Sequence, residues 1–291
     1  MSTLKQLRLR ISGVKSTQKI TKTMKMVAAS KLLKAQEQQK HTKTYADKMY
    51  HVIAQLSESV DDRDLTPLLV GNGNKKMYLL VTIGSDKGLC GSYNSVVARR
   101  LRSQIELLEE ASKNYKILCI GKKVFDQIKS QYGKSIIEVL PGMSEKQVKY
   151  DDAQFLSDKI IAWFGKNEFD VCYFIYNEFQ NALKQNIAMR KLIPMNEELL
   201  SIEKQEKHVY EYEPKEKDIL QHLLPLNLAV QIYYILLEAG ASEQGARMTS
   251  MDAATNNAKD MIDKLTLLYN RSRQAAITKE LIEIISSAES I

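Results

Sequence analysis

LLVTIGSDKGLCGSYN, at residues 79–94, is the stretch that decides the class of fold, because an apolar run ends there in a glycine-bearing turn and a helix-like segment follows. The order strand, turn, helix is typical of one unit of an α/β sheet. It is also the order in which nucleotide-binding proteins hold phosphate groups, at the N-terminus of the helix. The stretch therefore raises two questions: whether an α/β domain surrounds it, and whether it binds a nucleotide.

The glycines of this turn do not follow a known phosphate-binding pattern. Gly84, Gly88 and Gly91 have the spacing GxxxGxxG, whereas a dinucleotide loop needs GxGxxG. A P-loop needs GxxxxGK[ST], but Lys87 stands before its glycine, with no Ser or Thr placed for magnesium. We therefore predict a structural turn that binds no nucleotide, in which Asp86 and Lys87 are solvated charges.

Outward from this turn, strand-like runs alternate with helical patterns. The runs rich in β-branched and aromatic residues are 75–84, 115–121, 135–140 and 169–177. The helical patterns between them are 95–112, 122–132 and 151–166. Such alternation predicts an α/β unit with a largely parallel sheet. Residues 185–194 and 206–214 are weaker candidates for further strands.

The two ends of the chain have a different character. All five prolines lie between residues 67 and 225, and because proline costs about 3 kcal/mol in a helix interior, both ends are predicted to be long helices. Apolar residues recur at alternating spacings of three and four, which is typical of a coiled-coil seam. These residues are Leu4, Leu7, Ile11 and Val14; Tyr45, Met49, Val52 and Leu56; and Met251, Ala254, Ala258, Met261, Leu265 and Leu268. Two ordinary core helices of a bundle are the alternative.

We therefore predict an α/β fold in which the N- and C-terminal helices form a long antiparallel coiled coil beside a central Rossmann-like α/β domain. The predicted boundaries are 1–66 for the N-terminal helix, 67–215 for the central domain and 216–291 for the C-terminal helix. In this arrangement the chain leaves along one helix, forms the compact domain and returns along the other.

Positive charge is concentrated at the N-terminus. The formal net charge is +7, and the first 34 residues contain no Asp or Glu. Their basic residues are Lys5, Arg8, Arg10, Lys15, Lys19, Lys22, Lys25, Lys31 and Lys34. Positive charge near a helix N-terminus opposes the helix dipole, so the pattern favours an external acidic partner. Nucleic acid is one candidate, although the segment lacks aromatic residues that stack on bases; a solvated face is the other interpretation.

No pattern in the sequence indicates catalysis or metal binding. The three cysteines form no CxxC, the four histidines form no HExxH, and no GxSxG is present. The carboxylate cluster at 61–64 stands beside Thr66 and Pro67, where a helix must stop, and is predicted to be a solvated helix end. The most apolar helical stretch is interrupted by Gln231 and Glu238, which argues against a membrane span. We predict no catalytic residues, no cofactor and no metal.

Three segments resemble one known family. LRLRISGVKSTQKITKTMKMVAASKLLKAQ at 7–36, GSDKGLCGSYN at 84–94 and the C-terminal residues 241–290 are similar, in the same order, to the γ subunit of F-type ATP synthases. The resemblance implies a rotating central shaft that couples proton flow through a membrane c-ring to conformational cycling of β-subunit catalytic sites, for ATP synthesis or hydrolysis. The implied partners are the α, β, ε and c subunits, with one γ per three α and three β. No bond chemistry takes place on the γ chain itself.

The resemblance also assigns contact residues. Met24 matches a position near the lower loops of the β subunits, and Arg247 matches an arginine that reaches acidic residues in those loops. The polar residues that match the upper contact with the α and β subunits are Gln274, Thr278 and Glu280. The residues in the loop that resembles the contact with the c-ring and ε are Tyr212 and Glu213. The polar character of this set suits contacts that must form and break at every step.

The absence of a transit peptide favours a bacterial protein, peripheral at the cytoplasmic face of the plasma (inner) membrane and attached only through the c-ring. No nucleic-acid partner is expected. Two other classes of function stay open on the residues alone, an α/β enzyme that uses the central turn on a nucleotide and a basic coiled-coil protein that binds nucleic acid. Gly245 stands where the family usually has alanine, which lowers helix propensity by up to about 1 kcal/mol.

Overall fold

The structure, a computed structural model, describes residues 4–59, 66–142, 148–181, 185–195, 213 and 215–289. The chain forms two compact units, one made of residues 1–28 with 247–291 and the other of residues 29–246. Helices α1 (Leu4–Ser59) and α7 (Glu216–Glu289) each contribute to both units. The candidate strand at 206–214 falls outside the described residues except for Glu213, which is in a bend.

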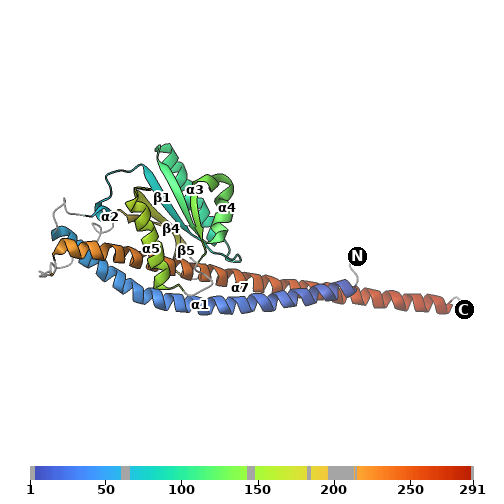
Figure 1. Ribbon diagram of the computed structural model, residues 1–291. Helices are drawn as coiled ribbons and strands as arrows, with labels where there is room; N and C mark the ends of the chain where they lie inside the picture. The colour runs from blue at the N-terminus through green and yellow to red at the C-terminus, as the bar shows by residue number, and fades with distance from the viewer. Residues whose placement is uncertain are drawn as a thin grey trace. The chain divides into compact units, whose positions relative to one another are not determined.

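The larger unit is built on one mixed sheet of five strands in the order β3-β2-β1-β4-β5 (Figure 1). Their bounds are Met77–Ile83 for β1, Asn114–Ile120 for β2, Ile136–Leu140 for β3, Val171–Phe179 for β4 and Gln185–Ile193 for β5. The central strand β1 pairs in parallel with β2 and β4, and β2 pairs in parallel with β3. Only β5 is antiparallel, against β4. The predicted α/β class and largely parallel sheet are confirmed.

Helices cover both faces of this sheet. Their bounds are Pro67–Val70 for α2, Tyr93–Glu110 for α3, Lys122–Tyr132 for α4, Gly133–Ser135 for the 3-10 helix η2 and Tyr150–Gly165 for α5. One hydrophobic cluster joins α3 and α4 to one face, and a second joins α5 and parts of α1 and α7 to the other. The crossover helices α3 and α4 therefore lie on the face opposite to α5 (Figure 1).

Strand β1 shows how the sequence builds this three-layer arrangement. Leu79 and Val81 belong to the cluster with α5, whereas Leu80 between them belongs to the cluster with α3 and α4. All three side chains are buried. Because successive strand residues point to opposite faces, a strand covered on both sides needs an unbroken apolar run. The run LLV at the start of the opening stretch supplies it.

The buried seam of α1 differs from the predicted one at two positions. Ala46, Met49 and Ile53 are buried, while Tyr45 is 53% exposed and Val52 is 42% exposed. The prediction selected Tyr45 and Val52 as the larger apolar side chains. The observed register instead continues the spacing of four and three from Thr42 through Ala46, Met49 and Ile53.

The same correction applies near the C-terminal end of α7. Met261 is 51% exposed and Leu268 is 47% exposed, so the outer part of the predicted seam was wrong at these positions. The partly buried residues there are Ile262, Tyr269 and the predicted seam residue Leu265. Met251 and Ala258 are buried as the seam predicts.

Helix α7 is apolar enough to raise the question of a membrane span. It is the one described helix whose length and composition would allow it to cross a bilayer, with a mean hydropathy of 1.4 over its most apolar 18 residues. Of that window, 67% is buried inside the structure, as in the core helix of a soluble protein. Pro225 lies within α7, at a position where the carbonyl four residues earlier, on Gln221, belongs to an exposed residue. Water can therefore satisfy the carbonyl that proline leaves unbonded.

A buried carboxylate fixes the start of two strands. Asp170, just before β4, accepts hydrogen bonds from the backbone N–H groups of Lys76 (2.8 Å) and Met77 (2.9 Å) and from Asn72 Nδ2 (2.6 Å). Burial raises the pKa of Asp170, but these hydrogen bonds and the charge of Lys76 outweigh it, and the net effect is a lowered pKa. The ionised carboxylate is thus the form that the fold stabilises.

We expect Asp170→Asn to lower the free energy of unfolding at neutral pH by about 1–3 kcal/mol, because an amide cannot accept all three hydrogen bonds as a carboxylate does. A lowered folded-state pKa stabilises the fold above the unfolded-state pKa, and this contribution is lost as the pH falls through the folded-state value. Urea unfolding of the parent should therefore weaken across this acidic range, and the variant should lose that component. Asp158→Asn, at an exposed carboxylate on α5, is the control. Parallel pH profiles for parent and Asp170→Asn would contradict the assignment.

Candidate functional site

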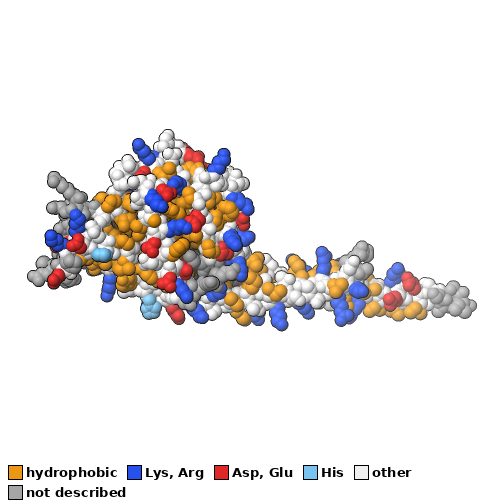
Figure 2. Space-filling view, viewed as in Figure 1, with side chains coloured by type: hydrophobic (Ala, Val, Ile, Leu, Met, Phe, Trp, Pro, Cys, Tyr) orange, Lys and Arg blue, Asp and Glu red, His pale blue; other side chains and the backbone are white. Residues whose placement is uncertain are grey.

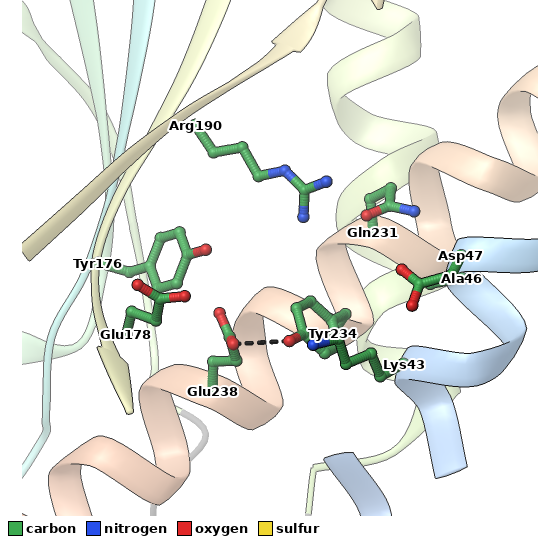
Figure 3. A pocket seen from close by; sticks show the side chains of 9 residues that line it. All are labelled: Lys43, Ala46, Asp47, Tyr176, Glu178, Arg190, Gln231, Tyr234 and Glu238. Carbon is green, nitrogen blue, oxygen red and sulfur yellow. Dashed lines mark hydrogen bonds between the residues drawn. The ribbon is translucent and has the colours of Figure 1, made fainter. Parts of the chain in front are cut away.

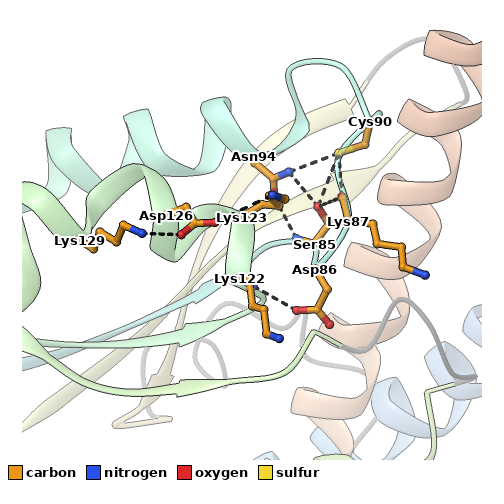
Figure 4. Close-up of polar contacts among 9 residues, drawn as sticks. All are labelled: Ser85, Asp86, Lys87, Cys90, Asn94, Lys122, Lys123, Asp126 and Lys129. Atoms are coloured by element: carbon orange, nitrogen blue, oxygen red, sulfur yellow. Dashed lines mark hydrogen bonds and ion pairs between the residues drawn. The ribbon is translucent and has the colours of Figure 1, made fainter.

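The turn after β1 is closed by its own side chains (Figure 4). The backbone N–H of Ser85 donates to Asn94 Oδ1 at 2.9 Å, and Asn94 Nδ2 donates to Ser85 Oγ at 2.8 Å. Asn94 Nδ2 also lies 3.3 Å from Cys90 Sγ, and Ser85 Oγ donates to the carbonyl of Lys87 at 2.7 Å. Ser85, Cys90 and Asn94 are all buried. The backbone N–H of Ser85, its hydroxyl group and the side-chain amide of Asn94 are therefore donors that the turn uses internally.

A carboxylate occupies the N-terminus of α4, where a phosphate would otherwise find free N–H groups. Asp86 Oδ1 accepts from the backbone N–H of Lys122 at 3.1 Å, and the carbonyl of Ser85 accepts from the N–H of Lys123 at 2.9 Å. The prediction that Asp86 is merely solvated was therefore wrong: it is half-buried and caps a helix. Lys87 is exposed, as expected. A fixed negative charge at this helix terminus disfavours an anionic ligand.

The crevice beside this turn is filled by the protein itself. In open α/β sheets, ligands bind at the carboxyl ends of the strands where the strand order reverses, here between β1 and β4. Tyr93 lies there, 2% exposed, and its hydroxyl donates to the carbonyl of Ala239 on α7 at 3.1 Å. Asn177 of β4 donates to the carbonyl of Tyr93 at 3.0 Å, and Tyr93 packs with Cys90 and Ala246. The usual ligand position of the fold is therefore a packing contact with α7.

The smaller unit is an antiparallel helix pair. Lys25 Nζ of α1 lies 2.6 Å from Asp252 Oδ1 of α7, and the hydroxyl of Thr255 lies 2.8 Å from that of Thr21. Both partners of the ion pair are more than 40% exposed, so the pair contributes at most about 1 kcal/mol. The small or polar residues Thr21, Ala28 and Ala258 are buried along the seam. Burial of these side chains, more than the exposed ion pair, is expected to hold the two helices together.

Helix α7 continues beyond the start of α1 (Figure 1). Thr21 and Thr255 contact each other, so the antiparallel pairing can be counted outward from them. Leu4, the first residue of α1, lies seventeen residues before Thr21, and Ser272 lies seventeen residues after Thr255. Beyond Ser272, therefore, α1 has no residue that could cover α7. The large apolar side chains left exposed there are Ile277, Leu281, Ile282, Ile284 and Ile285. We call this set the α7 end stripe.

The α7 end stripe was missed by reasoning from the sequence. The prediction of a coiled coil did not compare the lengths of the two helices, and α7 has 74 residues whereas α1 has 56. The signal was present, because Ile277, Leu281 and Ile284 follow the spacing of four and three that marks one helix face. An exposed apolar stripe of this kind marks an interaction surface.

The predicted contact residues are found on both helices of the smaller unit and outside it. Met24 on α1 and Arg247 on α7 are half-buried, and Arg247 already interacts with other residues of the chain. Gln274, Thr278 and Glu280 are all exposed on α7, in the same segment as the α7 end stripe. The Thr278 hydroxyl donates to the carbonyl of Gln274 at 3.0 Å. Glu213 is exposed, and Tyr212 lies outside the described residues.

Basic and apolar side chains are exposed together on the smaller unit (Figure 2), and many of them belong to α1. Its exposed basic residues are Lys5, Arg8, Arg10, Lys15, Lys19 and Lys22. Leu9, Ile20 and Met26 are each about 60% exposed on the same helix. Among the described residues, no group of three or more His, Cys, Asp or Glu side chains could hold a metal ion. This surface is suited to contacts with a protein surface that offers both acidic and apolar groups.

Comparison with known proteins gives one consistent result. A family model described as ATP synthase matches residues 3–291. The ATP synthase gamma chain of Pelagibacter ubique is 46% identical over 292 residues, and that of Rhodospirillum rubrum is 45% identical over 299 residues. Each alignment covers 100% of both chains.

Solved structures agree with the sequence relatives. A chain of the central stalk and c-ring of the Tetrahymena thermophila mitochondrial ATP synthase has a TM-score of 0.60 and 26% identity, covering 81% of this chain and 99% of that chain. A chain in the rotor of the Euglena gracilis mitochondrial ATP synthase has a TM-score of 0.67, covering 94% of this chain and 98% of that chain. At 18% identity, the second comparison supports the fold alone.

Proposed function

The chain belongs to the ATP synthase gamma chain family, the central stalk of the F-type ATP synthase rotor, and we propose that it turns as a shaft between a membrane c-ring and a hexamer of three α and three β subunits. In this proposal, the shaft forces the β catalytic sites through successive affinities for ADP, phosphate and ATP. The observation that carries it is the α7 end stripe, an apolar helix face that the described residues of this chain leave uncovered. It is the surface expected of a shaft that ends inside another protein.

The upper contact would be made by the end of α7. Gln274, Thr278 and Glu280 are exposed beside the apolar residues of the α7 end stripe. A mixed surface suits a bearing, because apolar area favours insertion into a sleeve while scattered polar groups form no single strong attachment. Their exposure supports a role in contact with the α and β subunits.

The lower contact would be made by the part of the smaller unit that contains Met24 of α1 and Arg247 of α7. Met24 and Arg247 are half-buried, and α1 nearby carries many exposed Lys and Arg residues. Acidic loops of the β subunits are the complementary surface. Ion pairs that remain partly solvated contribute about 0–1 kcal/mol each, so they can break and reform as the shaft turns.

The remaining assignments complete the proposal. The α/β domain, with predicted limits 67–215, would stand between the predicted coiled-coil segments 1–66 and 216–291 and the membrane. Tyr212 and Glu213 would contact the c-ring and ε subunit. The protein would then be peripheral at the cytoplasmic face of a bacterial plasma membrane, held there only through the c-ring. It would carry no catalytic group, cofactor or nucleic acid of its own.

The test is co-expression with the α and β subunits of the same organism, followed by sizing and an ATPase assay. We expect one copy of this chain in an ATP-hydrolysing complex with three α and three β subunits. Elution of the chain alone, while α and β assemble without it, would overturn the shaft proposal. In that case ATP binding to the isolated chain would be measured next, since a nucleotide enzyme predicts saturable binding.

Individual contacts are tested in the same complex. We expect Arg247→Ala to lower the rate of ATP hydrolysis by up to about fivefold, because removal of one partly solvated charge contact changes a free energy by up to about 1 kcal/mol. Glu280→Gln should act in the same range at the upper contact. The control is Lys264→Ala, at an exposed position of α7 that the proposal assigns to no partner. If the control lowers the rate as much as Arg247→Ala does, the assigned role of Arg247 fails.

A further inference from the structure

A cavity of about 290 Å³ lies inside the larger unit, where α1 and α7 meet strands β4 and β5 (Figure 3). Glu238 and Tyr234 line it from α7, Tyr176 and Glu178 from β4, and Arg190 from β5. Lys43 and Asp47 of α1 are exposed residues at its rim. The volume exceeds that of one water, which occupies about 30 Å³ in the liquid. None of these residues belongs to the contacts proposed for the shaft.

Glu238 is the unusual group in this cavity. It is 3% exposed, and its Oε1 accepts hydrogen bonds from Tyr234 Oη at 2.8 Å and from Gln39 Nε2 at 3.1 Å. Its Oε2 is buried without a hydrogen-bond partner in the described structure. Buried polar atoms in native proteins nearly always have a partner. The carboxyl group therefore presents one unsatisfied oxygen beside a space large enough for a ligand.

The charges around Glu238 do not compensate it. Burial raises the pKa of Glu238, and the nearby charge of Glu178 adds to the rise, whereas the hydroxyl groups of Tyr234 and Tyr176 oppose it. Arg190 lowers this pKa only weakly. Its guanidinium instead lies over the ring of Tyr50, 5.6 Å from the centroid, with Nη2 donating to the Tyr50 hydroxyl at 3.3 Å. A positive charge placed between the two glutamates would meet a need that the protein leaves open.

We propose that this cavity binds a small organic ammonium ion, whose N–H groups donate to Glu238 Oε2 and to Glu178. Binding of the ammonium ion favours the ionised form of Glu238, so any proton held by this carboxyl group is released to solvent and one positive charge replaces another. The rings of Tyr176 and Tyr234 line the same space and favour a cation through their faces. Three N–H donors match an ammonium group to the two carboxyl groups.

Other ligand classes fit less well. An anion would be placed beside Glu178 and the buried Glu238, while Lys43 stands at the exposed rim and Arg190 is held at Tyr50. A divalent metal needs about six or more oxygen ligands or several waters, and the described residues offer no cluster of three metal-binding side chains. A primary ammonium with a short alkyl chain satisfies both the charge and the available volume.

The test is calorimetric titration of the assembled complex with ethylammonium chloride, in two buffers of different ionisation enthalpy. We expect saturable binding with release of up to one proton, and an affinity that rises about tenfold per pH unit while Glu238 is protonated. Potassium chloride at the same ionic strength should not reproduce the heat. If no complex assembles, the same titration on the full chain tests this site independently of the shaft proposal.

Glu238→Gln is the decisive variant, because an amide keeps the shape of the neutral acid. We expect it to weaken binding by at least tenfold and to abolish proton release, with an unchanged melting temperature as evidence that it folds. Glu178→Gln should weaken binding less, and Lys43→Gln, which removes a positive charge from the rim, should leave binding unchanged or tighten it. Equal binding by the parent and Glu238→Gln, or no saturable heat with the parent, would overturn the proposal and leave water as the occupant.

Discussion

Replacement of Gly121 by alanine is expected to lower the free energy of unfolding of the larger unit by about 2–6 kcal/mol. Gly121 has φ +96°, a conformation that side-chain-bearing residues rarely adopt. A Cβ atom there would lie 2.3 Å from the carbonyl oxygen of Gly84 and 2.5 Å from its carbon. Strain in the backbone and collision with another backbone therefore add together.

The collision cannot be relieved by a side-chain rotation, because both partners are backbone atoms held by the sheet. Gly121 N–H donates to the carbonyl of Leu140 at 2.9 Å, and Gly84 N–H donates to that of Ile120 at 2.7 Å. Gly133→Ala is the matched control, since its added Cβ would meet no atom within 4 Å and its φ is –52°. Urea unfolding should separate the two variants by several kcal/mol. Similar midpoints for both would show that the two turns can move apart.

Removal of the Tyr93 side chain is the second large effect. We expect Tyr93→Ala to lower the free energy of unfolding by about 3–5 kcal/mol, because a fully buried ring leaves a cavity that its surroundings fill only in part. Tyr93→Phe, which loses only the hydrogen bond to the Ala239 carbonyl, should lower it by about 0.5–1.5 kcal/mol.

The pair of variants also separates packing from hydrogen bonding at the junction between α3 and α7. Thermal and urea unfolding followed by circular dichroism would measure both. The difference between the two variants is the contribution of the ring itself. If Tyr93→Ala and Tyr93→Phe are equally mild, the crevice beside β1 is not held closed by this side chain, and its availability to ligands should be tested again.

Local patterns in the sequence were sufficient to predict the sheet and the helices that cover it. The apolar run at Leu79, Leu80 and Val81 predicts a strand buried on both faces, and the structure confirms it. The glycine spacing after it correctly indicates a structural turn, yet the role of Asp86 depends on Lys122, the first residue of α4, which follows the next strand. Residue spacing alone could not supply that contact.

The coiled-coil register shows where such reasoning reaches its limit. Tyr45 and Val52 have the right spacing and more apolar surface than Ala46, yet the structure buries Ala46 and leaves the other two exposed, and the local spacing does not indicate which set is buried. In the same way, Glu238 interrupts an apolar stretch in the sequence and gives no sign of the cavity. Gln39 and Arg190, which define its surroundings, come from segments far away in the chain.

The contact residues were inferred from resemblance, and the structure adds a physical context for only some of them. Gln274, Thr278 and Glu280 lie in a segment that the pairing of α1 with α7 leaves uncovered. That property depends on the difference in length between two helices. To predict this uncovered segment from sequence, one must know which residues of α1 lie opposite which residues of α7. Such knowledge requires specific contacts, for example that between Lys25 and Asp252.

The three cysteines of the chain are all buried and unpaired by disulfides. Burial raises the pKa of the Cys119 thiol to about 11 and raises that of Cys172 as well. A thiol reacts through its thiolate, so these groups should be slow toward maleimides in the folded protein. A single cysteine introduced at an exposed position of the larger unit, such as Asp158 on α5, would then be a selective attachment point. A fluorophore or bead fixed there would report the angular position of this chain directly, without removal of any native cysteine.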